Sequence, residues 1–224
     1  IPGFVLDSYS ALSQIQGSTD WQVSLVVASD QPDEEAAPVL TINSGLEGVQ
    51  LNLPAPLRKR ADENWPLVLH YPLSEKDSLL NIELVDRVTL NFDLAEETGS
   101  PRSAAVGVGG GNPSLPTDGL IRIRGEAPEI DLDGWIDVII DDASEGKGLG
   151  GLKLEPSSLI AGQINFLDRP FADVAMNFEM IGGDVKAAFS SADIDGKVSF
   201  TQGDSGLSSL TAEIERLSLA DPMS

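Results

Sequence analysis

Cysteine is absent from this chain, and histidine occurs only once, at position 70. Without cysteine the chain can form no disulfide framework, no thiolate nucleophile and no Cys-ligated metal site. A single imidazole also excludes a metal site built on a pair of histidines from this chain. Composition therefore removes thiol chemistry and the commonest zinc centres from consideration.

Basic residues are scarce. The chain carries 14 Lys and Arg against 36 Asp and Glu, for a formal net charge of −22. Such a surface repels the phosphates of nucleic acids and of anionic membranes. We expect no nucleic-acid partner and no membrane contact through a basic patch.

Aromatic residues make up 5% of the sequence, and no apolar run approaches the roughly 20 residues that span a bilayer. Gly (22) and Pro (14) are frequent instead, which favours short strands and turns over long helices. The first residues, "IPGFVLDSY", contain neither Met nor a basic, apolar signal. We therefore expect a mainly β chain, 1–224, that is one section of a longer protein.

The dominant pattern is an alternation of apolar and polar residues. Residues 1–16 are predicted to form a short lead-in helix, and strands are predicted over 17–127 and again over 151–224. Alternation places one apolar side chain in two on a single strand face. The apolar positions so predicted are Val49, Leu51, Leu53, Leu80, Ile82, Leu84, Val88, Leu90, Phe92, Ile121, Ile123, Val174, Met176 and Phe178.

Residues 119–135, "GLIRIRGEAPEIDLDGW", change from strand to helix within a few positions. Ile121 and Ile123 are predicted to face the apolar interior, with Arg122 and Arg124 facing solvent or acidic neighbours. Pro128 is predicted to end the extended run. Asp131 or Asp133 would then cap a helix over 131–142, which covers part of the interior near 133–141 with Trp135 as its plug.

The chemical motifs are weak. "GVGGGNP" lacks the spacing of a dinucleotide or phosphate loop and is interpreted as a turn. The Asp-x-Asp-Gly elements at 131–134 and 193–196 lack the further ligands of a calcium loop, so a helix cap and a hairpin turn are predicted. Arg58, Lys59 and Arg60 are interpreted as a solvated loop, and His70 as an ordinary strand residue. No catalytic residue, metal ligand or cofactor is assigned.

Three blocks of sequence nevertheless resemble consecutive segments of large bacterial envelope proteins of the YhdP type, which are AsmA-like. These blocks are "LDSYSALSQIQGSTDWQVSLVV", "GLEGVQLNLPAPLRKRADENWPLVLHY" and "AVGVGGGNPSLPTDGLIRIRGEAPEIDLDGWIDVI". The resemblance spans about residues 6–140 and continues more faintly to Leu219. Its most specific marks are Leu53-Pro54-Ala55-Pro56-Leu57 and the pairing of Gly119-Leu120 with Leu132-Asp133-Gly134-Trp135.

The resemblance implies a protein anchored by one N-terminal inner-membrane helix, with a long β body in the periplasm of a Gram-negative cell. That body is a strongly twisted antiparallel sheet that curls into an elongated groove, along which phospholipids pass between the two membranes. The partners so implied are phospholipid acyl chains and the remainder of the same long chain. The apolar positions listed above, from Val49 to Phe178, are then the candidates to face those acyl chains. Membrane contact would be made only by parts of that long protein that lie outside these 224 residues.

Two other functions fit the same residues. A closed sandwich or barrel, in which the apolar positions form an ordinary core, would make the chain a structural or binding module. A binding module would need exposed aromatic residues, for which Trp65 is the best candidate. An enzyme would need His70 or an acidic pair in a concave pocket.

Overall fold

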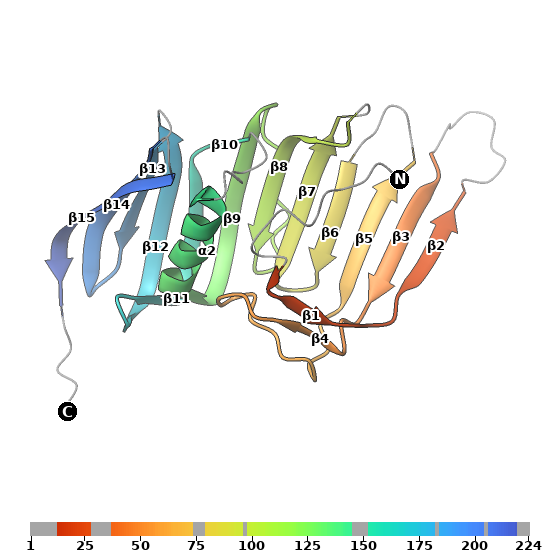
Figure 1. Cartoon of the computed structure of the whole chain (residues 1–224), viewed down its shortest axis with the longest axis horizontal. Helices are drawn as coiled ribbons and strands as arrows, with labels where there is room; N and C mark the ends of the chain where they lie inside the picture. The colour runs from red at the N-terminus through yellow and green to blue at the C-terminus, as the bar shows by residue number, and fades with distance from the viewer. Residues whose placement is uncertain are drawn as a thin grey trace.

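The computed structural model describes residues 13–27, 37–73, 79–95, 98–144, 152–181, 184–203 and 206–218. Within these ranges it is a mainly β protein dominated by one wide, twisted sheet (Figure 1). The elements are β1 (Ile15–Gly17), β2 (Gln22–Val26), β3 (Val39–Ser44), β4 (Val49–Leu51), β5 (Leu67–Pro72), β6 (Leu79–Leu84), β7 (Val88–Leu94), β8 (Pro101–Val108), β9 (Leu120–Asp131), α2 (Leu132–Ser144), β10 (Lys153–Leu154), β11 (Ser157–Phe166), β12 (Arg169–Ile181), β13 (Asp184–Ser190), β14 (Ile194–Gly203) and β15 (Gly206–Leu217).

The sheet is open. Its order is β15-β14-β13-β12-β11-β9-β8-β7-β6-β5-β3-β2, and β10 adds to β9 off this path. Most neighbours are antiparallel, as predicted, but β9 runs parallel to β8, β10 and β11. Because β2 and β15 do not pair with each other, the predicted groove-like sheet is confirmed and a closed barrel is excluded.

Helix α2 makes the crossover between the parallel strands β9 and β11. It begins where expected, because the Asp131 carboxylate accepts a hydrogen bond (3.1 Å) from the Gly134 N–H in the first turn. The helix then runs to Ser144, which confirms the prediction over 131–142.

The prediction that Pro128 ends the extended run is wrong, because β9 continues to Asp131. Pro128 has no N–H to donate, and the register of β9 with β11 skips this position together with Gly162. A Cβ on Gly162 would lie 2.9 Å from the Pro128 carbonyl oxygen. Gly162 therefore lets the two strands remain adjacent past the proline.

The sheet curls around α2. The helix contacts both β11 and β15, although β12, β13 and β14 separate these two strands in the sheet. Figure 1 shows α2 lying across one face of this half. Leu132, Trp135 and Ile136 of α2 pack there against a buried cluster that includes Ile164 and Val174. The face that carries α2 is therefore the inner face of the curve.

A small second sheet lies near the ends of β5 and β6 of the large sheet (Figure 1). It pairs β1 with β4, from Ile15 opposite Leu51 to Gly17 opposite Val49. The predicted lead-in helix is therefore wrong for residues 15 and 16, because pairing with β4 fixes them as a strand, and residues 1–12 lie outside the described residues. Val49 and Leu51 pack into a buried cluster with Trp65 and other apolar side chains.

The loop after β4 and the start of α2 are joined by direct contacts. The Ala55 carbonyl oxygen accepts hydrogen bonds from the Trp135 indole N–H (2.8 Å) and from the Asp131 N–H (3.1 Å). The Arg58 guanidinium pairs with the Asp131 carboxylate at 3.0 Å. The two most specific marks of the family resemblance thus contact each other in space. We call this contact the loop–helix joint.

Gly134 allows this close approach, and its replacement tests the joint. A Cβ at this position would lie 2.9 Å from Pro54 Cγ and 3.0 Å from Pro54 Cβ. Gly to Ala normally stabilises a helix by about 0.5–1 kcal/mol. We expect Gly134→Ala to destabilise the chain instead, by roughly 1 kcal/mol or more, because Pro54 must move. Urea unfolding measures the change, and a gain in stability would mean that the joint does not form.

Candidate functional site

The registers of the sheet place apolar side chains in rows that cross the strands. Residues directly opposite each other in neighbouring strands point to the same face. One row crosses eleven strands without a break, and we call it the long row. It comprises Ser44, Leu67, Leu84, Val88, Val108, Gly125, Leu159, Met176, Phe189, Gly196 and Ile214.

A second row runs beside the long row on the same face, and we call it the open row. From β3 to β9 it comprises Ile42, Leu69, Ile82, Leu90, Val106 and Ile123. Each of these side chains is partly exposed, and so are Phe178 and Val198 further along the sheet. The open row is thus an apolar strip that other parts of the chain leave partly uncovered.

The candidates predicted from the sequence fall into three groups in the structure. Val49, Leu51 and Leu53 are buried at or near the small sheet. Leu84, Val88, Ile121, Val174 and Met176 are buried on the large sheet. Leu80, Ile82, Leu90, Phe92, Ile123 and Phe178 are partly exposed, and three of them belong to the open row.

Other elements of the chain cover the buried candidates. Val174, which is 1% exposed, and Met176 belong to the cluster that packs against α2. Ile121 packs with Leu152 and Leu154, at the segment that includes β10. The inner face is therefore covered where α2 packs on it, and it is partly uncovered along the open row.

Both edges of the sheet keep apolar side chains in solvent. On β2, which is exposed throughout, Val23 and Leu25 are 62% and 54% exposed. On β15, Ile214 and Leu217 are 39% and 45% exposed. Val23 is the register partner of Ile42, and Ile214 belongs to the long row. The apolar face therefore reaches both edges.

Comparison with known proteins places the chain in a family. The YhdP protein family matches residues 6–224, which is nearly the whole chain. This chain belongs to the YhdP family of AsmA-like bacterial envelope proteins. No curated protein and no solved structure matches it.

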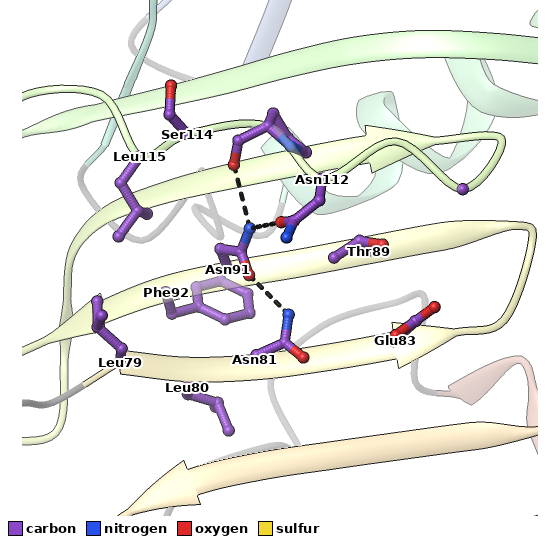
Figure 2. A pocket seen from close by; sticks show the side chains of 12 residues that line it. Leu79, Leu80, Asn81, Glu83, Thr89, Asn91, Phe92, Asn112, Ser114 and Leu115 are labelled. Carbon is purple, nitrogen blue, oxygen red and sulfur yellow. Dashed lines mark hydrogen bonds between the residues drawn. The ribbon is translucent and has the colours of Figure 1, made fainter.

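In this YhdP-family chain, the opposite face of the sheet carries most of the polar strand residues, together with a few exposed apolar ones such as Leu79 and Ile160. At β6 and β7 a hollow of about 660 Å³ lies beneath the segment 110–115. Figure 2 shows that its amides bond one another: Asn81 donates to Asn91 (2.7 Å), and Asn91 donates to Asn112 (2.7 Å) and to the Pro113 carbonyl. These amides therefore find hydrogen-bond partners in one another and in the backbone above them.

The structure also places the residues on which the two alternative functions depended, His70 and Trp65. His70 lies on β5, exposed, with its Nδ1 3.1 Å from Thr41 Oγ1, and lines neither this hollow nor the second one on the polar face. Trp65 is the best candidate for the exposed aromatic residue that a binding module would need, but it is only 6% exposed and lies under the Arg87 guanidinium at 3.6 Å. Its burial follows from the cluster it forms with Val49 and Leu51.

Within the described ranges, no group of three or more His, Cys, Asp or Glu side chains is placed to hold a metal ion. The two Asp-x-Asp-Gly elements have structural roles instead. The Asp133 carboxylate accepts hydrogen bonds (3.0 Å each) from the N–H groups of Leu167 and Asp168, in the turn between β11 and β12. Asp193 lies between β13 and β14, as the predicted hairpin turn requires. Among the residues that the structure describes, no helix is long and apolar enough to cross a membrane.

The basic cluster is only partly a solvated loop. Arg58 and Arg60 are exposed, but Lys59 is 1% exposed, so the prediction of a solvated loop is wrong at this residue. Its ammonium donates to the carbonyls of Leu46 (2.7 Å), Val49 (2.8 Å) and Arg60 (3.0 Å). Burial lowers the pKa of Lys59, and nearby carboxylates, led by Glu63, oppose this shift.

Lys59→Met tests the role of this buried ammonium. The substitution keeps a long apolar side chain but leaves three carbonyls without their donor. We expect the free energy of unfolding to fall by about 2–4 kcal/mol. The exposed variant Arg60→Met is the control and should change it by no more than about 0.5 kcal/mol. Equal, small effects of both variants in urea unfolding would contradict the burial of Lys59.

Proposed function

We propose that this chain is a section of a lipid-conducting surface in the bacterial envelope. Phospholipid acyl chains lie along the open row of its sheet and pass on to neighbouring parts of the same long protein. The section works in the periplasm, between the inner and outer membranes. It performs no chemistry on the lipid, and membrane contact is made by other parts of the full-length protein.

One observation carries this proposal: the apolar rows are in register across the sheet and stay partly uncovered. From β3 to β9 the open row takes five interstrand steps of about 4.8 Å, or roughly 24 Å in all. A closed core would bury these side chains fully. The row instead offers a strip of Val, Leu and Ile side chains to an apolar ligand.

The energetics suit transport rather than tight binding. Each CH₂ group removed from water contributes about 0.8 kcal/mol, so an acyl chain gains stability wherever it lies on the row. The aliphatic side chains of the open row provide no fixed polar contact that would favour one position over the next. A lipid can therefore shift along the row without crossing a large barrier.

A second candidate, a structural module with a closed core, is favoured by the cluster beneath α2. Ala161, Val174 and Ile164 are almost completely buried there. That half of the inner face is a packed core in the usual sense. In this proposal the part of the inner face beneath α2 is a structural core, and the open row is the part that contacts lipid.

Site-specific photo-crosslinking in the full-length protein tests the proposal. A photoreactive amino acid is placed at Leu69 or at His70, in cells whose phospholipids are labelled with radioactive phosphate. These neighbours on β5 face opposite sides of the sheet, and His70 is the more exposed of the two. We expect labelled phospholipid to be captured from Leu69 and not from His70.

The control for this experiment is Val174, which is covered and should capture no lipid if the path follows the open row. Capture at Leu69 and His70 alike would indicate non-specific contact with lipid. No capture at Leu69, with the protein present at normal levels, would leave the structural module as the function of the section.

A further inference from the structure

The polar face carries a second hollow, of about 570 Å³, across β9 to β14. Two register rows line it. The first runs from Arg124 through Ser158, Asn177 and Ala188 to Lys197. The second joins Glu179, Lys186 and Ser199. Phe178, Ala187 and Val198 also border the hollow, but they alternate along the strands with the residues of these two rows. By this alternation the side chains of the two rows lie on the opposite side of the sheet from the open row.

The charge of this hollow is unusual for the chain. Three basic side chains line it against one acidic side chain, Glu179, whereas the whole chain has a formal charge of −22. In the described residues neither Glu179 nor Glu213, the register partner of Lys197, lies within 4.0 Å of a basic group of the hollow. Elsewhere Arg58, Arg102 and Arg122 each pair with a carboxylate.

The polar side chains of this hollow also differ from those of the first one. In the hollow at β6 and β7 the amides bond one another. Here Ser158, Asn177 and Ser199 make no side-chain hydrogen bond to another described residue. Their donors, and those of the three basic groups, remain available to a ligand.

We propose that this hollow binds a water-soluble phosphorylated compound. Ammonium and guanidinium groups together with hydroxyl and amide donors match the several oxygens of a phosphoryl group. Lys186 and Lys197 lie on adjacent strands, whereas Arg124 is three strand spacings from β13, roughly 14 Å along the sheet. The hollow therefore suits a ligand that carries more than one anionic group, and is larger than a single phosphate requires.

The sheet itself argues against a transported lipid as the source of the phosphate. A phospholipid whose acyl chains lie on the open row has its head on the inner face, and the backbone separates that face from Arg124 and Lys197. The proposal consequently does not depend on lipid conduction, and either can fail without the other.

Isothermal titration of the 224-residue chain with pyrophosphate tests the site. We expect saturable binding that weakens as NaCl is raised, because the contacts are exposed charges. Lys186→Gln combined with Lys197→Gln should weaken binding roughly tenfold or more through lost charge-assisted hydrogen bonds. Lys153→Gln, an exposed lysine on β10 outside the hollow, is the matched control and should leave binding unchanged.

Two further titrations distinguish other ligands. Dihexanoyl phosphatidylglycerol below its micellar concentration should bind, if at all, equally to the parent and to the double variant. A tetraglutamate peptide should bind more weakly than pyrophosphate. The proposal is overturned if pyrophosphate binding does not saturate, or if Lys153→Gln weakens it as much as the double variant does. It is also overturned if the lipid or the peptide, and not pyrophosphate, is the ligand whose binding the double variant weakens.

Discussion

The carbonyl oxygen of Ala55 joins the loop that follows the small sheet to the start of α2. It accepts one hydrogen bond from the backbone of Asp131 and one from the indole of Trp135, about eighty residues further along the chain. These bonds fix the start of α2 against the loop that follows the small sheet. Since α2 in turn contacts both β11 and β15, the joint links the N-terminal half of the chain to the helix around which the C-terminal half of the sheet curls.

The large sheet separates two different surfaces. On the inner face, register partners such as Ile82, Leu90 and Val106 align apolar side chains across the strands. On the other face, polar groups either bond one another, as at Asn81 and Asn91, or are exposed to solvent, as at Asn177. Because successive residues of a strand point to opposite faces, one alternating sequence pattern builds both surfaces.

The local sequence pattern predicted which side chains of β9 face the interior and where α2 begins. The alternation of Ile121 and Ile123 with Arg122 and Arg124 is confirmed, since Ile121 is buried, Ile123 lies in the open row and Arg122 pairs with Glu155. The cap at Asp131 is also confirmed. Each of these features is decided by residues within a few positions of one another.

The features that local pattern missed depend on distant partners. Ile15 belongs to a strand because β4 lies beside it, and not because of its own spacing. Lys59 is buried because carbonyls from three other positions converge on its ammonium. The basic run in this proline-rich segment does not indicate that the Lys59 ammonium is surrounded by carbonyls. The contact of Arg87 with Trp65 cannot be predicted from the local sequence either.

The division of the inner face into covered and open parts follows from the direction of β9. Two parallel neighbours cannot be joined by a tight turn, so the chain must leave the sheet between β9 and β11 and cross over one face. The apolar side chains of α2, among them Leu132 and Ile136, need an apolar surface, and only the inner face provides one. From β3 to β8 the chain instead pairs antiparallel strands in sequence, so no crossover is needed there and the open row stays partly uncovered. The parallel pairing of β9 with β11 thus decides which part of the inner face is a packed core and which part stays partly uncovered.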